Sequence, residues 1–269
     1  EKSRNLMTVR IAQEIGIDKV ASFAKNLKIY DNPDELLSIS LGSAETTLLK
    51  LTSAYSSFVN GGKLIEPIFL DRIQDSEGNT IFNSEKRICE KCKEISYLGE
   101  DVPKIKDNFI QIISEETAYQ ITSMLEGVVK RGTGRKLKNL NLDLAGKTGT
   151  TNENTDAWFV GFTSNLVIGV YVGHDEPQTL GKYETGSKTA MPIFKSFIKK
   201  AIKRGDARPF KVAKNIKFLV VDQKTGRKAD FGSKTTIIEA FKKSDLTKNF
   251  LIYDDFNLKL DKNNILKFY

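Results

Sequence analysis

The sequence predicts an α+β fold in which helices flank an antiparallel sheet. Helical patterns open the chain, strand-like segments follow at 68–84 and 156–176, and a further helical pattern covers 189–205. The strands do not alternate with helices in βαβ units, so a parallel sheet is not indicated. The 269 residues are 39% hydrophobic, which is enough to bury a sizeable core.

The helices are indicated by apolar residues at intervals of three and four. Residues 6–29 show this spacing in two pieces that Gly16 separates, and residues 48–58 show it in one piece that ends before a Gly-Gly pair. Residues 114–131 begin with a serine that can cap a helix. The pattern at 189–205 has a proline near its start, where helices tolerate it.

Three strand pairs are predicted from β-rich segments. Within 68–84, the turn signal Glu-Gly-Asn at 77–79 indicates a hairpin. Residues 156–176 are mostly apolar and are broken at 163–165, which indicates two well-buried antiparallel strands joined by a tight turn. Residues 216–230 predict another hairpin.

The charge pattern limits the classes of partner. The formal net charge is +8 at pH 7, but the basic residues are scattered and not interleaved with aromatics. We therefore expect a solvated basic surface and no nucleic-acid partner. No apolar run reaches the length of a membrane span. The chain opens inside a helical pattern without an initiator methionine or a signal peptide, so we expect it to be part of a larger protein.

The two cysteines, Cys89 and Cys92, stand in the segment RICEKCKEI. They supply half of a zinc site, His174 lies far away in the sequence, and no thioredoxin-like βαβ pattern surrounds them. A local disulfide or a pair of reduced thiols is the simpler interpretation. We predict no metal and no cofactor.

Lys147 stands in the segment LAGKTGTT, which otherwise has the pattern of a strand edge. A lysine is rarely fully buried unless something pairs with it. The segment is therefore either a turn with a solvated lysine or a cradle in which ammonium, hydroxyl and N–H groups face a carboxylate or an oxyanion. Because the chain has one histidine, acyl-transfer or hydrolytic chemistry would need lysine as its proton carrier.

Two short motifs connect this lysine with the start of the chain. Ser3 and Asn5 in KSRN, followed by Lys147-Thr148-Gly149, resemble the S-x-N and K-T-G boxes of penicillin-binding proteins and serine β-lactamases. The wider sequence resembles the transpeptidase domain of class A bifunctional penicillin-binding proteins. The segments that carry this resemblance include SRNLMTVRIAQEIG, RGTGR, AGKTGTTNENTDAWFVGFT and TGSKTAMPIFKSFI. The resemblance extends from residue 1 to about residue 242.

The resemblance implies a β-lactamase/transpeptidase-like fold that is truncated at its N-terminus. In the family, the acylated serine belongs to an S-x-x-K box upstream of S-x-N. Ser22 with Lys25 and Ser196 with Lys199 fit that pattern, but they lie on the wrong side of Ser3 and are expected by chance. We expect the true box to precede this chain, and the chain alone to be inactive.

The resemblance also implies a role for each matched residue. Ser3 would relay a proton to departing D-alanine beside Lys147, and Asn5 would hold the substrate amide. Thr148 and Thr150 would receive the terminal carboxylate, and the N–H of Thr150 would form half of an oxyanion hole. Gly149 would let the substrate backbone approach the strand edge. The alternative interpretation is that Ser3 and Asn5 only cap a helix.

Domains, partners and location follow from the same resemblance. Residues 1–205 would be the C-terminal portion of the transpeptidase domain, with a hairpin insertion at 66–108, and residues 206–269 a C-terminal extension. The partners would be peptidoglycan stem peptides, lipid II-derived glycan strands and β-lactams. The intact protein would carry a glycosyltransferase domain and a membrane anchor, and would face the periplasm from the inner membrane, where a Cys89–Cys92 bridge is favoured.

Other functions stay open at this stage. A serine β-lactamase shares the Lys-Thr-Gly strand and would differ by fast deacylation. A non-catalytic β-lactam sensor or a wall-binding scaffold would keep the same boxes. A zinc or redox module built on the two cysteines is a further alternative.

Overall fold

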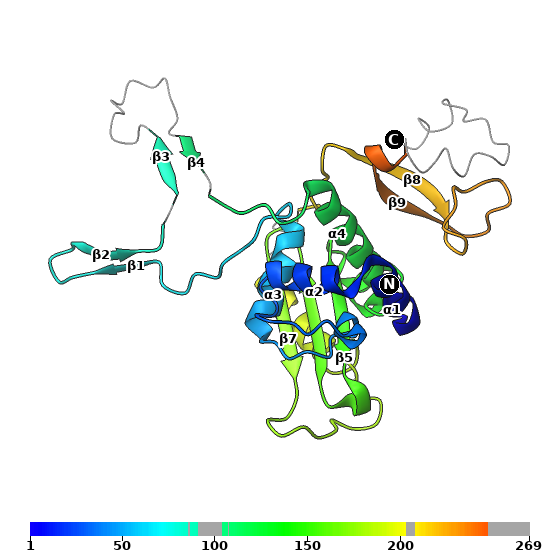
Figure 1. Cartoon of the computed structure of the whole chain (residues 1–269), viewed down its shortest axis with the longest axis horizontal. Coiled ribbons are helices and arrows are strands. Elements are labelled where there is room, and N and C mark those ends of the chain that lie inside the picture. The colour runs from blue at the N-terminus through cyan, green and yellow to red at the C-terminus, as the bar shows by residue number, and fades with distance from the viewer. Residues whose placement is uncertain (86, 91–103, 107, 203–207, 247–269) are drawn as a thin grey trace.

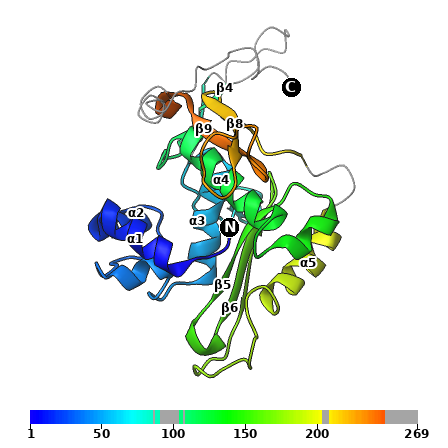
Figure 2. The ribbon, with the colours of Figure 1, turned by 90° about the vertical axis from the view of Figure 1, so that its right-hand side faces the viewer.

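The computed structural model describes residues 1–85, 87–90, 104–106, 108–202 and 208–246 (Figure 1). Its central feature is an antiparallel sheet of β5 (Ala145–Thr150), β6 (Ala157–Phe162) and β7 (Val167–Val172), in that spatial order. Helices cover both faces of this sheet (Figure 2). The predicted α+β fold with an antiparallel sheet is therefore confirmed.

The helices form where the apolar spacing predicts them. They are α1 (Asn5–Ile15), α2 (Ile17–Asn26), α3 (Leu48–Val59), α4 (Glu115–Lys130) and α5 (Ala190–Ala201). Short stretches of 3₁₀-helix occur as η1 (Leu37–Leu41), η2 (Arg135–Leu140) and η3 (Asn152–Asn154).

Local chemistry fixes the ends of these helices. Gly16 separates α1 from α2 with a φ of 101°, a conformation that glycine adopts readily. The hydroxyls of Thr47 and Ser114 accept hydrogen bonds from backbone N–H groups in the first turns of α3 and α4. Each cap satisfies an N–H group that the helix itself leaves without a partner.

The main core lies between the sheet and α5. Phe159 of β6 and Phe194 of α5 are fully buried, with ring centroids 4.8 Å apart. Leu137, Leu144 and Met191 complete this layer. On the other face of the sheet, α3 and α4 pack against β7 and β5. The core therefore holds β5 in place from both sides.

Two small hairpins extend from the body (Figure 1). The predicted hairpin at 68–84 is confirmed as β1 (Arg72–Gln74) and β2 (Thr80–Asn83), with Gly78 at a φ of 87° in the turn. The second pair is β3 (Ile88–Glu90) and β4 (Lys104–Lys106).

The prediction that both strands at 156–176 are well buried is wrong for one of them. Phe159 and Phe162 of β6 are completely buried, but every residue of β7 keeps some exposure and Tyr171 is 41% exposed. The reason is position, because β6 is the central strand of the sheet whereas β7 lies at its edge.

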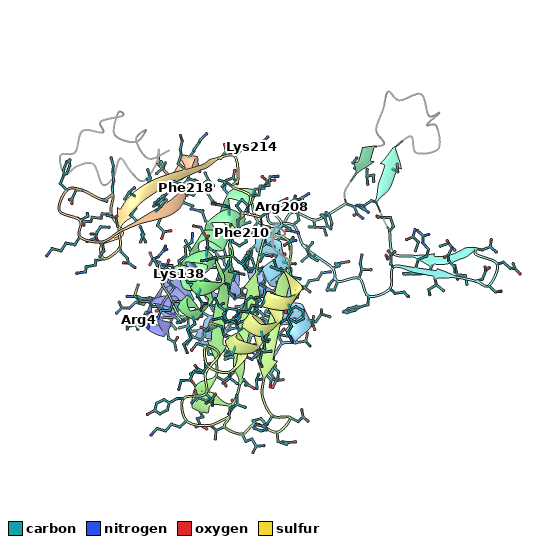
Figure 3. The ribbon with its side chains drawn as sticks, turned by 180° about the vertical axis from the view of Figure 1, so that it is seen from behind. Arg4, Lys138, Arg208, Phe210, Lys214 and Phe218 are labelled. Atoms are coloured by element: carbon teal, nitrogen blue, oxygen red, sulfur yellow. The ribbon has the colours of Figure 1, made fainter. Side chains whose placement is uncertain are left out.

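The strand partner predicted near the C-terminus is also wrong. β8 (Ile216–Asp222) pairs with β9 (Thr236–Lys242), not with residues inside 216–230. The segment between them makes one bridge, Val221 with Lys228. The β8–β9 hairpin packs on α4: Tyr119 of α4 and Phe218 of β8 meet edge to face at 6.1 Å, and Gln120 Nε2 donates to the carbonyl of Ala240 in β9 at 3.0 Å. Figure 3 shows the hairpin with Phe218 from behind.

Candidate active site

Lys147 lies in the middle of β5, the first strand of the central sheet. β5 pairs with β6 along one side, and within the described residues no strand pairs with its other side. Lys147 pairs with Val160, and Gly149 pairs with Trp158. This open edge can accept an extended peptide as an added strand.

The structure brings Lys147 and Ser3 into contact. Lys147 Nζ donates a hydrogen bond of 2.7 Å to Ser3 Oγ and a second one of 2.6 Å to the carbonyl oxygen of Thr148. The two predicted motifs therefore form one site, as their shared resemblance implies.

Contacts made by Glu1, two residues before Ser3, hold the start of the chain there. The carboxylate of Glu1 forms an ion pair with the guanidinium of Arg131, and the Thr133 N–H donates to the Glu1 carbonyl at 3.4 Å. A side chain at Gly132 would place its Cβ 2.4 Å from that carbonyl oxygen, so only glycine lets the segment of residues 1–3 lie this close. Ser3 itself has a φ of 49°, an unusual value for a residue other than glycine.

Burial makes the charged form of Lys147 less favourable than it is in water. Burial lowers the pKa of the Lys147 ammonium below its usual value of 10.5. Among the described residues, no carboxylate lies within ion-pair distance of Lys147 Nζ, whose hydrogen bonds go to a hydroxyl and a carbonyl. A half-buried ammonium without an acidic partner is suited to receive an anionic ligand.

Asn5 is the first residue of α1 and is exposed, and its side chain makes no hydrogen bond with a described residue. The residue at the N-cap position is Arg4, and no side chain caps this helix end. Helix capping therefore does not explain why Ser3 and Asn5 are polar.

The residues after Lys147 are fixed by contacts from two other segments. Thr148 Oγ1 lies 2.9 Å from Thr133 Oγ1, and Thr150 Oγ1 accepts from the Gly186 N–H at 3.1 Å. A Cβ on Gly149 would lie 3.0 Å from that of Trp158, which is tighter than almost all natural contacts.

Sequence reasoning missed Thr133 and Gly186 as site residues. Both stand in segments that carry the family resemblance, RGTGR and TGSKT. These segments were matched, but no role was assigned to Thr133 or Gly186. A Cβ at Gly186 would lie 2.3 Å from the Trp158 carbonyl oxygen and 2.4 Å from that of Gly149. The backbone of Gly186 therefore lies directly against β5 and β6.

The two S-x-x-K matches lie outside this site. Ser22 is an exposed residue of α2, and Lys25 Nζ donates to Asn32 Oδ1 at 3.3 Å. Ser196 is exposed on α5, the helix that covers the opposite face of the sheet from α3 and α4 (Figure 2). Neither serine makes a hydrogen bond with Lys147 in the described part of the chain.

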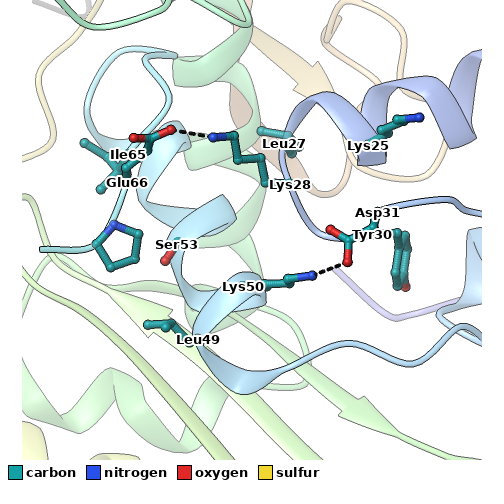
Figure 4. A pocket seen from close by; sticks show the side chains of 11 residues that line it. Lys25, Leu27, Lys28, Tyr30, Asp31, Leu49, Lys50, Ser53, Ile65 and Glu66 are labelled. Carbon is teal, nitrogen blue, oxygen red and sulfur yellow. Dashed lines mark hydrogen bonds and ion pairs between the residues drawn. The ribbon is translucent and has the colours of Figure 1, made fainter. Parts of the chain in front are cut away.

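A separate pocket of about 400 Å³ lies between α2, α3 and the segment around Glu66 (Figure 4). Two of its lysines already have acidic partners, because Lys28 pairs with Glu66 and Lys50 pairs with Asp31 at 2.8 Å. This pocket contains none of the predicted site residues.

Cys89 lies in β3 and is disulfide-bonded. Cys92, the partner that the sequence predicts, lies outside the described residues. Within the described part of the chain, no group of three or more His, Cys, Asp and Glu side chains could hold a metal ion.

Ser3 and Lys147 lie together at the edge of the central sheet, as the resemblance to penicillin-recognising proteins predicts. The family described as penicillin binding protein transpeptidase domain matches residues 1–199, and the chain belongs to this family. Relatives of this chain include penicillin-binding protein 1A of Rickettsia bellii, 41% identical over 98% of this chain and 33% of the relative. Penicillin-binding protein 1A of Pseudomonas aeruginosa is 33% identical over 91% of this chain and 34% of its own length.

Solved structures agree with this assignment. Penicillin-binding protein 1A from Haemophilus influenzae superposes with a TM-score of 0.74 and 32% identity, over 88% of this chain and 38% of that chain. The match to a transpeptidase family does not favour the β-lactamase alternative. The chain spans about a third of the length of the curated relatives it matches. Among the described helices, none has the length and apolar character needed to cross a bilayer.

Proposed function

We propose that this chain forms part of a serine D,D-transpeptidase that cross-links peptidoglycan stem peptides ending in D-Ala-D-Ala. The observation that carries the proposal is the hydrogen bond between Lys147 and Ser3, made by an ammonium that has no acidic partner among the described residues. The terminal carboxylate of the donor peptide would supply that partner, beside the hydroxyls of Thr148 and Thr150.

In the first half of the reaction, a serine oxygen attacks the carbonyl carbon of the penultimate D-alanine, and its proton passes to the lysine of its own S-x-x-K box. The oxyanion that forms is stabilised by backbone N–H groups, one of them that of Thr150. The C–N bond to the terminal D-alanine then breaks, and Ser3 Oγ gives its proton to the departing nitrogen and receives another from the box lysine. Lys147 orients Ser3 and stabilises the negative charge that develops on Ser3 Oγ.

In the second half, the amine of an acceptor peptide attacks the ester carbon. Its nitrogen forms the new amide bond, and its proton passes to Ser3, which relays one to the box lysine. The ester bond to the serine breaks as that oxygen regains the proton from this lysine. Asn5 would hold the amide of the bound donor through both halves, which fits its exposed position two residues after Ser3.

The attacking serine belongs to an S-x-x-K box outside residues 1–269 in this proposal. The support is geometric, because Ser22 and Ser196 lie on helices and make no contact with Lys147. Residues 1–205 would then be a portion of the transpeptidase domain, and residues 206–269 an extension whose hairpin β8–β9 packs on α4.

The intact protein would also carry a glycosyltransferase domain and a membrane anchor, and would work at the periplasmic face of the inner membrane on lipid II-derived glycan. The support is the likeness to penicillin-binding protein 1A, whose members are about three times as long as this chain.

The test is the mass of the full-length protein after incubation with a penicillin. We expect a stoichiometric, long-lived adduct on an S-x-x-K serine outside this chain, and no adduct when Lys147→Ala is introduced. An adduct on Ser22 or Ser196, or none at all, would overturn the proposal. A rapidly cleared adduct would favour a β-lactamase.

A further inference from the structure

A second pocket, of about 370 Å³, lies next to the Ser3–Lys147 pair. We call it the basic pocket, because every charged side chain that lines it is a cation. It is formed by Lys2, Arg131, Thr133, Arg135, Lys136 and Ser187.

Most of the positive charge in the basic pocket is unpaired. Arg131 shares the carboxylates of Glu1 and Glu239. Lys2, Arg135 and Lys136 form no ion pair with any described residue. The pocket near α2 differs, because acidic side chains there neutralise Lys28 and Lys50 (Figure 4). A concave site lined by cations without acidic partners favours an anionic ligand.

Three connections place the basic pocket at one side of the reaction centre. Lys2 precedes Ser3, which accepts from Lys147. The Thr133 hydroxyl contacts that of Thr148. Ser187 follows Gly186, whose N–H donates to Thr150 Oγ1. In the proposed reaction this is the side from which the terminal D-alanine departs, since Thr148 and Thr150 receive its carboxylate.

The acceptor must come to the same side. Its nitrogen attacks the carbon that the D-alanine nitrogen has just left, and Ser3 handles the proton in both steps. The acceptor has a carboxylate next to its amine. Any further group that the acceptor carries therefore reaches past Thr148 towards Thr133. The basic pocket is large enough for an amino-acid side chain.

We propose that the basic pocket selects the acceptor of the proposed transpeptidation, and that it favours amines carrying an acidic side chain in addition to the carboxylate beside the amine. Arg135 and Lys136 are the specificity residues, because both project from η2 at the pocket rim and neither has a competing acidic partner. This inference rests on the proposed function and adds the chemical class of the second substrate.

The experiment uses the full-length protein, a D-Ala-D-Ala thioester donor, and free D-glutamate or D-glutamine as acceptor. These acceptors have the same shape and differ by one charge. The measurement is the ratio of aminolysis to hydrolysis of the acyl-enzyme. We expect wild type to favour D-glutamate by about fivefold, since each exposed ion pair contributes modestly. The Arg135→Ala/Lys136→Ala variant should lose this preference, while its ratio of aminolysis to hydrolysis with D-glutamine stays at the wild-type value. High salt should weaken the preference of wild type for D-glutamate.

The matched control is Lys138→Ala, because Lys138 is an exposed lysine of the same 3₁₀ turn that does not line the pocket (Figure 3). It should keep the preference. The inference would be overturned, with the proposed function left standing, if wild type gave the same ratio of aminolysis to hydrolysis with both acceptors. The same holds if Lys138→Ala lost the preference for D-glutamate. Failure of the donor to form any acyl-enzyme would overturn the proposed function, and this inference with it.

Discussion

The Nζ of Lys147 donates a 2.7 Å hydrogen bond to the Oγ of Ser3, although 144 positions separate the two residues. The pair exists because Glu1 is anchored on Arg131 and Thr133, at the end of α4. Helix α4 also packs along β5, which carries Lys147. The site therefore depends on how α4 holds the first three residues against the sheet.

Replacing Lys147 with methionine should separate activity from stability. The substitution keeps a long side chain but removes a desolvated charge that lacks an acidic partner among the described residues. Because that charge is costly to bury, the free energy of unfolding should rise by about 1 kcal/mol at pH 7. Acylation by penicillin should fall by about two orders of magnitude or more, because the carboxylate loses its cation. Denaturant unfolding and stopped-flow acylation measure the two effects.

The control for this variant is Lys138→Met, on an exposed lysine whose removal should change stability by about 0.5 kcal/mol at most. A Lys147→Met protein that unfolds more easily than wild type would show that the ammonium stabilises the fold, contrary to this account.

The rate of acylation should fall as the pH rises, and this alkaline limb should begin below pH 10.5. Burial lowers the pKa of Lys147 from 10.5, so its ammonium is fully present below the shifted pKa and is lost as the pH rises through it. Acylation rates of wild type and Lys147→Arg between pH 7 and pH 10.5 provide the test. The arginine variant will be slower, but its guanidinium stays charged, so the limb should disappear. A limb that persists unchanged in that variant would belong to another group.

Thr133 should be coupled to Thr148. Their hydroxyls are 2.9 Å apart, and Thr133→Val removes the hydroxyl with little change of shape. We expect a loss of about 1 kcal/mol of stability and a several-fold weaker acylation, since Thr148 loses the partner that orients it. A double-mutant cycle with Thr148→Val measures the coupling directly. Strictly additive effects would mean that the two hydroxyls act independently.

Much of the fold was predictable because it depends on local signals. Gly16 separates two helices, Ser114 caps a third, and the turn at Gly78 closes a hairpin, and each of these follows from neighbouring residues. The partner of β8 was not predictable in this way. The nearer segment offers turn residues, whereas β9 is held by the contact of its Ala240 with Gln120 of α4, which is distant in sequence.

The same division applies to the site. Ser3 and Lys147 were identified by motif, and the structure brings them together. The supporting residues Thr133 and Gly186 act through contacts with β5 that no short pattern encodes. The Arg135 and Lys136 side of the basic pocket was equally hidden, since in sequence these residues are two more members of a lysine-rich surface.

Gly186→Ala gives the sharpest test of how β5 is supported. The added Cβ would lie 2.3 Å from the Trp158 carbonyl oxygen and 2.4 Å from the Gly149 carbonyl oxygen, and both are backbone atoms that cannot rotate away. We expect a loss of about 1–3 kcal/mol in unfolding free energy, as for other overpacked sites. Acylation should weaken as well, because the Gly186 N–H moves away from Thr150 Oγ1.

The matched control is Gly232→Ala, where the nearest atom to the added Cβ is Asp230 Oδ1 at 3.4 Å. It should unfold at the wild-type denaturant midpoint and keep normal acylation. If Gly186→Ala matched this control in both measurements, the close contact between residue 186 and β5 would not exist in solution. If it lost acylation alone, with stability intact, Gly186 would act mainly by positioning Thr150 and little by packing.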